Sequence, residues 1–269
     1  MAELSAFAAY RTVVGSRLRS QLSYRVSFSV DLVTSFLIAA CEFLEIYVIL
    51  QLVPSLGGLD LRQAALVFAL SNVAFGLGDL VFGQLDSMST FLRLGRLEAL
   101  LVRPMPLMAQ LITSDLQLRR LGRVAVGLVV LVVVVRGLDV DWTAGRVWLL
   151  VGTPVVGAVI FGALFAIAGG LQFYLVDGAE FTNGFTYGGS YASQLPAAVL
   201  LSPLRILFTF VIPATVVSYL PVLLILDLPG PRYLPAWLGW YGPLFMVWAW
   251  LLAAIAWRSG VRHFTGAGG

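Results

Sequence analysis

The sequence predicts an all-α integral membrane protein with six transmembrane helices. Of its 269 residues, 59% are hydrophobic and only 12% are charged, a balance typical of membrane proteins. Apolar stretches close to the roughly 20 residues needed to cross a bilayer recur along the chain. Arginines gather between some of these stretches, the pattern that orients spans in a membrane. This length leaves no room for a separate soluble catalytic or nucleotide-binding domain.

The first 25 residues predict an amphipathic helix in the membrane interface. Leu4, Phe7 and Val14 recur at helical spacing, whereas Arg11 and Arg17 fall elsewhere on the helix. The stretch lacks the uninterrupted apolar core of a signal peptide. A basic tail without regular structure is the alternative interpretation.

The first two spans carry polar side chains that we expect to face the bundle interior. They are expected over about residues 28–53 and 63–85. Glu42 and Glu45 are three residues apart in the first span and therefore share a helix face. Asn72 and Asp79 form a polar stripe in the second. Acidic residues inside spans usually face protein or water rather than lipid, so this stripe could pack inside the bundle or line a substrate path.

A charged segment, Phe91–Pro104, interrupts the apolar pattern after the second span. Arg93, Arg96, Glu98 and Arg103 lie within it, and each charge would cost about 3 kcal/mol at the bilayer centre. The segment is therefore expected outside the membrane. Pro104 then ends or redirects the chain.

The same segment has helical periodicity and predicts one short amphipathic helix. Its shared apolar face would consist of Phe91, Leu94, Leu97, Leu101 and Val102. Such a basic helix could contact a cytoplasmic protein partner or lie on anionic lipid headgroups. From the residues alone, both interpretations stay open.

The remaining spans are less regular. Three further spans are expected over about residues 121–138, 147–171 and 239–257. Residues 178–201, with Tyr187 and Tyr191, predict either a polar-faced fifth span lining a cavity or a cytoplasmic linker. Residues 204–226 contain Pro213 and predict either a re-entrant hairpin or a kinked span.

The arginines predict the orientation. In the expected topology, twelve of the 17 basic residues fall on one side and five on the other. The richer side holds both termini and the segment 86–123, which are therefore expected in the cytoplasm. The net charge of +3 is explained by this asymmetry and does not indicate nucleic-acid binding.

No catalytic motif is present in the sequence. The chain has no Walker A motif, no H-E-x-x-H and no G-x-S-x-G, and it contains one histidine and one cysteine. We expect no metal site and no cofactor bound by this chain. Two other function classes stay open: an ion- or proton-coupled carrier using Glu42, Glu45 and Asp79, and a membrane enzyme using paired carboxylates.

Three blocks of sequence, in order, resemble the type-2 ABC transporter permeases, and most closely the branch paired with daunorubicin-resistance-type ATPases. The first is R-x-G-x-L-E-x-L-L-x-R-P at residues 93–104. The second is F-T-F-V-I-P at 208–213 followed by Y-x-P at 219–221. The third is W-x-x-G-x-x-x-F-x-G-x-G at 257–268, where Phe264 stands in place of the usual tyrosine.

This resemblance implies a single permease domain with specific parts. It implies an interfacial helix in residues 1–25, a coupling helix within 86–120 between the second and third spans, and a re-entrant element within 202–238 before the last span. It favours 178–201 as the fifth span.

The resemblance also implies a function. Such permeases have no catalytic activity; they pair with a second permease, the same chain or a related one, and with two copies of a separate ATPase that binds ATP and Mg. The substrate would be an amphipathic, drug-like or lipid-like compound exported across a bacterial cytoplasmic membrane. The ATPase-coupling residues would be Arg93, Gly95, Arg96, Glu98, Arg103 and Pro104. The candidate substrate-path residues are Asn72, Asp79, Tyr187 and Tyr191.

Overall fold

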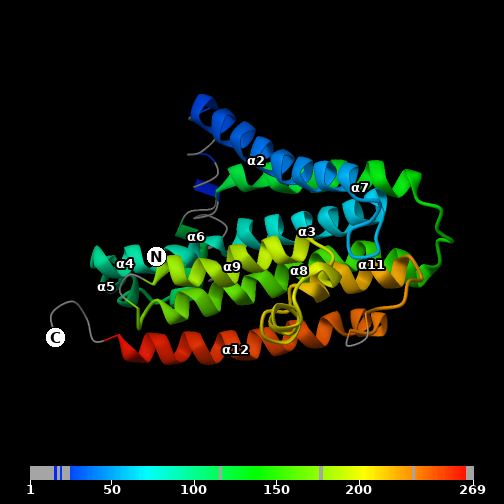
Figure 1. The fold of residues 1–269 in the computed structure, drawn as a ribbon. Coiled ribbons are helices and arrows are strands. Elements are labelled where there is room, and N and C mark those ends of the chain that lie inside the picture. Colours follow the sequence, from blue (N-terminus) through cyan, green and yellow to red (C-terminus); the bar gives the residue numbers. More distant parts are fainter. Residues whose placement is uncertain are drawn as a thin grey trace.

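The structure, a computed structural model, is mainly helical over the residues that it describes (Figure 1). These residues are 15–16, 19, 25–114, 117–175, 178–231 and 234–264. Within them, extended pairing is limited to one isolated bridge between Leu56 and Leu59. The interfacial helix expected over residues 1–25 lies almost entirely outside the described residues.

The bundle is built around one buried helix. In chain order, the long helices are α2 (Arg25–Leu52), α3 (Leu61–Phe82), α7 (Leu121–Gly137), α8 (Ala144–Leu171), α9 (Ala179–Gln194) and α12 (Gly242–His263). Helix α3 packs between α7 and α8, while α2 packs on α7 and α12 packs on α8 (Figure 1). Helix α9 covers α3 and α8. Helix α3 carries the buried polar residues Ser71, Asn72 and Asp79, and polar side chains inside a membrane are stable when they face protein rather than lipid.

The start of α3 is fixed by local interactions. The Asp60 side chain accepts a hydrogen bond from the Gln63 backbone N–H at 2.9 Å, and the Gln63 side chain accepts one from the Asp60 backbone N–H at 3.1 Å. This capping box satisfies backbone groups that the first helical turn would leave unpaired. Gly57 and Gly58, both at positive φ, form the turn that leads from α2 into it.

Small residues bring α8 and α12 close together. A Cβ atom added at Gly170 of α8 would lie 2.7 Å from the carbonyl carbon of Ala256 in α12. Gly260 of α12 approaches the backbone of Gly170 in the same way. The absence of a side chain at these positions therefore sets the separation of the two helices.

Four helices in the described part of the chain are long and apolar enough to cross a membrane. They are α2, α3 with its continuation to Arg93, α8, and α12 with the turn before it. A fifth is added if the bent pair Ser202–Val211 and Thr215–Ile225 counts as one span. Helices α7 and α9 are shorter, with 17 and 16 residues.

The charged segment does not form the single helix that its periodicity predicts. It forms α4 (Met88–Arg93) and α5 (Arg96–Leu101), which are separated at Gly95 by a left-handed backbone with φ of 63°. Leu97 is buried, but Leu94 and Val102 are exposed, so the predicted common apolar face is wrong. The break lets Leu97 insert into the bundle end while its neighbours turn outward.

The region between α9 and α12 is helical but interrupted. Helix α9 forms within residues 178–201, the stretch expected as a fifth span or a cytoplasmic linker, and it stops at Gln194, before Pro196. Next come α10 (Ser202–Ile206), a π-helical turn (Leu207–Val211), a 3-10 turn (Thr215–Val217) and α11 (Tyr219–Ile225). The two halves meet at 67° around Pro213. The Arg205 guanidinium donates to backbone carbonyls in 197–200, which satisfies the non-helical backbone there.

The charged segment lies at one end of the bundle. Helices α4, α5 and α6 (Leu107–Ser114) lie at the same end as the last turn of α12 (Figure 1). The turns that join α2 to α3 and α7 to α8 lie towards the opposite end.

Candidate functional site

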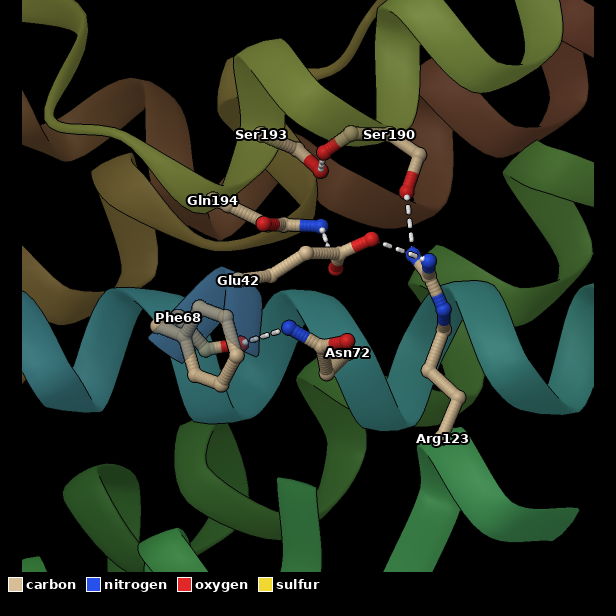
Figure 2. Close-up of polar contacts among 7 residues, drawn as sticks. All are labelled: Glu42, Phe68, Asn72, Arg123, Ser190, Ser193 and Gln194. Atoms are coloured by element: carbon tan, nitrogen blue, oxygen red, sulfur yellow. Dashed lines mark hydrogen bonds and ion pairs between the residues drawn. The ribbon is translucent and has the colours of Figure 1, made fainter. Parts of the chain in front are cut away.

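A polar network joins the three helices α2, α7 and α9. The Arg123 guanidinium of α7 lies 2.5 Å from the Glu42 carboxylate of α2. Gln194 of α9 donates its side-chain N–H to the other Glu42 oxygen at 3.1 Å, and Arg123 also donates to the Ser190 hydroxyl at 3.4 Å. Figure 2 shows the Glu42 carboxylate between Arg123 and Gln194. One carboxylate therefore ties α2 to both α7 and α9.

A second contact continues this link along the same pair of helices. The Tyr191 hydroxyl of α9 donates to the Glu45 carboxylate of α2 at 2.7 Å. Glu42 and Glu45 thus share the face of α2 that meets α9, as their spacing predicts. In the described structure, two polar contacts therefore link α2 to α9, one through Glu42 and one through Glu45.

Asp79 of α3 belongs to a separate ion pair. Its carboxylate lies 3.2 Å from the Arg120 guanidinium, and Arg120 also donates to the Asp79 backbone carbonyl at 2.6 Å. Gly83 makes room for this arrangement, because a Cβ atom there would collide with both side chains. The double contact fixes the start of α7 against α3.

This ion pair borders a cavity of about 170 Å³ at the end of the bundle nearer α4. The cavity is formed by α2, α3, α9 and the turn that opens α7. Its lining is Ser35, Ile38, Phe75, Asp79, Arg119, Arg120, Arg123 and Tyr187. Two of the predicted substrate-path residues, Asp79 and Tyr187, therefore meet at one cavity.

The other two predicted substrate-path residues lie elsewhere. Tyr191 faces Glu45, as described above. Asn72 is fully buried in α3, where its side-chain N–H donates to the Phe68 carbonyl at 3.2 Å (Figure 2). Asn72 is not among the residues that line this cavity.

The predicted ATPase-coupling residues are exposed and lie on α4, α5 and the turns beside them. They are Arg93, Gly95, Arg96, Glu98, Arg103 and Pro104. Gln110 of α6 donates its side-chain N–H to the backbone carbonyls of Leu100 and Met105 at 2.9 and 2.8 Å. Buried Leu97 and Gln110 thus attach the exposed surface to the bundle.

Gln172 connects this surface to the membrane helices. It follows α8 directly and is fully buried. Its side-chain oxygen accepts the backbone N–H of Ser89 in α4 at 2.7 Å. Its side-chain N–H donates to the Asp86 carbonyl at 3.0 Å and to the Thr182 hydroxyl of α9 at 2.8 Å. One amide therefore holds the starts of α4 and α9 to the end of α8.

Sequence reasoning missed the partners in these networks. Arg120 and Arg123 enter the sequence argument only as charges that set orientation. Arg123 lies inside the expected span 121–138, and an ionisable residue in a span calls for a partner, so a pairing with Glu42 could have been proposed. Gln172 and Gln194 carry no comparable signal, because a single glutamine has no distinctive spacing.

Comparison with known proteins identifies a family. The sequence model of the family described as ABC-2 family transporter protein matches residues 36–268, which is most of the chain. No curated protein and no solved structure matches the chain.

Proposed function

Since the chain belongs to the ABC-2 family of transporter proteins, a multi-pass membrane family that generally works with ATPase subunits, we propose that it is the transmembrane subunit of an ATP-driven exporter. The observation that carries this proposal is the exposed surface of α4 and α5. Six residues of the predicted coupling motif lie together there, at one end of the bundle and attached to it by Leu97. A charged, projecting surface of this kind suits a protein partner that pushes on the bundle.

In the proposed topology the chain crosses a bacterial cytoplasmic membrane six times. The spans are α2, α3, α7, α8, α9 and α12, and the bent segment between α9 and α12 is re-entrant. Helix α7 supports this count because it runs beside α3 along its length despite being short. The arginine asymmetry supports a cytoplasmic position for both termini and for α4 to α6.

The proposed assembly contains four subunits. Two copies of a separate ATPase bind ATP and Mg and dock on the coupling surface, and a second permease, identical or related, completes the substrate path. The exposed side of α2 is available for this second permease or for lipid: its only buried residues are Ala39 and Ile46.

The proposed substrate path lies between α2 and α9, where Asp79, Tyr187 and Tyr191 are found. Its cargo is an amphipathic, drug-like or lipid-like compound. The ion pairs favour an exporter over an ion-coupled carrier, because Glu42 and Asp79 already hold arginine partners. A carboxylate that cycles protons needs to lose its partner at each turn.

Affinity purification tests the assembly. The tagged full chain is extracted from its native membrane in mild detergent, and the co-purifying proteins are identified by mass spectrometry. We expect a stoichiometric ATPase, with or without a second permease. A chain that purifies alone and moves solute in liposomes under an ion gradient would contradict the proposal and favour the carrier.

A charge reversal tests the docking surface. Glu98→Arg is expected to uncouple ATP hydrolysis from transport while the permease stays folded, because Glu98 lies on the exposed side of α5. Normal coupled transport by this variant would exclude α5 as the coupling helix. Asp139→Asn, in the exposed turn between α7 and α8, is the control.

A further inference from the structure

We propose that the cavity beside Asp79 binds the oxyanion headgroup of an amphipathic molecule, with phosphate or carboxylate as the recognised group. The inference deepens the proposed function, on which it rests for the role of the bound molecule as cargo. The site itself is argued from the charges, shape and position of the cavity.

The charges in the cavity favour an anion. Three guanidinium groups line it, those of Arg119, Arg120 and Arg123. The described lining contains one carboxylate, Asp79, and Asp79 interacts electrostatically with all three arginines. The network above adds a second carboxylate, Glu42, which pairs with Arg123. Asp86, outside the lining, is a third carboxylate, and it interacts with Asp79 and Arg120. Among the three lining arginines of the described structure, Arg120 and Arg123 form ion pairs, whereas the Arg119 side chain is hydrogen-bonded to a neutral group, so Arg119 is the charge that favours an anion.

Arg119 is the arginine best placed to receive this anion. Its guanidinium donates two hydrogen bonds to the neutral Gln117 side-chain oxygen, at 3.0 and 2.7 Å. It is exposed at the rim, whereas Arg120 and Arg123 are mostly covered and hold their carboxylates. Planar guanidinium groups suit the bidentate recognition of phosphate and carboxylate.

The backbone adds to the positive potential. Arg119 and Arg120 belong to a 3-10 turn (Leu118–Arg120) that leads directly into α7, and Arg123 lies in the first turn of that helix. The first turn of a helix carries a partial positive charge from its unpaired N–H groups. Charged side chains and helix dipole therefore act in the same direction.

The remaining lining favours an apolar group attached to the anion. Phe75, Ile38 and Tyr187 form the other walls, and the Phe75 ring lies 5.0 Å from the Arg123 guanidinium carbon. This cation–π contact holds Arg123 in place beside an apolar surface. The volume of about 170 Å³ far exceeds the roughly 10–15 Å³ that a single water needs. A headgroup and the first part of an apolar chain fit this combination.

Direct binding tests the site. The full-length chain is reconstituted in nanodiscs of phosphatidylcholine, and the affinity of radiolabelled dodecyl phosphate is measured beside that of dodecyltrimethylammonium. We expect preference for dodecyl phosphate. Arg119→Gln is expected to weaken its binding roughly tenfold, the size of one charge-assisted contact, and Arg119→Glu to weaken it further. Arg136→Gln, an exposed arginine at the far end of α7, is the matched control and should bind as the unmodified chain does.

Two results would overturn the proposal. One is that dodecyltrimethylammonium binds as tightly as dodecyl phosphate or more tightly, which would indicate that the cavity binds cations through the Asp79 carboxylate. The other is unchanged dodecyl phosphate binding in both Arg119 variants. Because Arg119 is exposed, these variants are expected to fold, and their elution from a sizing column checks this.

A further arm identifies the source of the oxyanion. Nanodiscs are doped with phosphatidylglycerol: displacement of the probe by this lipid indicates a resident phospholipid, and retention of the probe indicates the headgroup of exported cargo. Binding needs no ATPase, so the two proposals fail separately. If no ATPase co-purifies but probe binding depends on Arg119, the exporter proposal fails and the anion site stands. If an ATPase co-purifies but probe binding does not depend on Arg119, the anion site fails and the exporter proposal stands.

Discussion

Arg123 in the first turn of α7 and Glu42 in the middle of α2 form an ion pair with 2.5 Å between nitrogen and oxygen. Their side chains are only 18% and 22% exposed. The pair matters because α2 has the fewest buried residues of the long helices in the described structure, and polar side chains link it to α9. The Glu42 side chain therefore holds α2 against α7 and α9.

Glu42→Gln should lower the stability of the chain. The change leaves the Arg123 charge without its partner in a mostly covered position, and we expect a loss of about 2 kcal/mol, below the cost at a fully buried pair. Thermal unfolding in detergent, followed by loss of the monodisperse elution peak, measures it. Glu180→Gln, an exposed glutamate in the first turn of α9, is the control and should change stability by less than about 1 kcal/mol.

The double variant Glu42→Gln with Arg123→Gln completes the comparison. It should be less destabilised than the sum of the two single variants, since no unpaired charge remains. Strict additivity would show that the pair does not couple α2 to α7. A carrier mechanism would instead predict that Glu42→Gln abolishes ion-coupled uptake in liposomes.

Gln172→Leu should loosen the connection between α4 and α8. Leucine keeps much of the volume but removes all three hydrogen bonds, so the buried Ser89 N–H loses its acceptor. A buried unpaired polar group costs about 1–3 kcal/mol. We expect faster amide hydrogen exchange in α4 and fewer molecules transported per ATP in the complex.

The control for Gln172 is Gln51→Leu, at an exposed position in the last turn of α2. It should leave exchange in α4 unchanged. Equal exchange in α4 for Gln172→Leu and the unmodified chain would show that Gln172 does not hold the coupling surface to the bundle.

Gly170→Ala should separate α8 from α12. The added Cβ atom would lie 2.7 Å from the Ala256 carbonyl carbon, and backbone cannot move away as a flexible side chain can. Overpacking of this kind costs about 1–3 kcal/mol, which thermal unfolding in detergent detects. Gly152→Ala in the same helix has ordinary contacts of 3.6 Å or more and should be neutral or slightly stabilising. Equal stability of the two variants would exclude close packing at Gly170.

Gly95→Val should disturb the turn between α4 and α5 alone. The backbone there has φ of 63°, and a side chain would meet no neighbour within 4 Å, so the strain comes from the backbone conformation. We expect a local cost of about 2 kcal/mol, reduced ATPase docking and an unchanged melting temperature of the bundle. Gly95→Asn is the matched variant, because asparagine tolerates the left-handed region better, and it should retain docking. Similar docking by both variants would contradict a role for this turn.

Some features of the molecule follow from the order of residues alone. The apolar stretches place α2, α3 and α8 within about three residues of their observed bounds, because burial from water is a local property of each stretch, whereas α12 continues about six residues past its expected end. The three blocks of the family pattern likewise identify the transporter family, which the match over residues 36–268 confirms. The charged residues of 93–104 could be placed outside the bundle interior for the same local reason.

Other features depend on contacts between distant parts of the chain. The spacing of Glu42 and Glu45 predicts a shared face, but only the packing of α7 and α9 supplies Arg123 and Gln194 as partners. The periodicity of 91–102 predicts one helix, yet the left-handed turn at Gly95 divides it. Asn72 and Asp79 look alike in the sequence pattern, and the structure separates them into a buried helix contact and a cavity wall.

The sequence by itself therefore determined that the chain is an α-helical membrane protein of a transporter family, and where its apolar helices lie. Only the tertiary structure decided which polar groups meet: Arg123 with Glu42, Asp79 with Arg120, and Gln172 with the starts of α4 and α9. The physical reason is the distance over which each kind of interaction acts. Hydrophobic burial is read from neighbouring residues, whereas a hydrogen bond or ion pair acts over about 3 Å between side chains that the sequence separates by up to 152 positions.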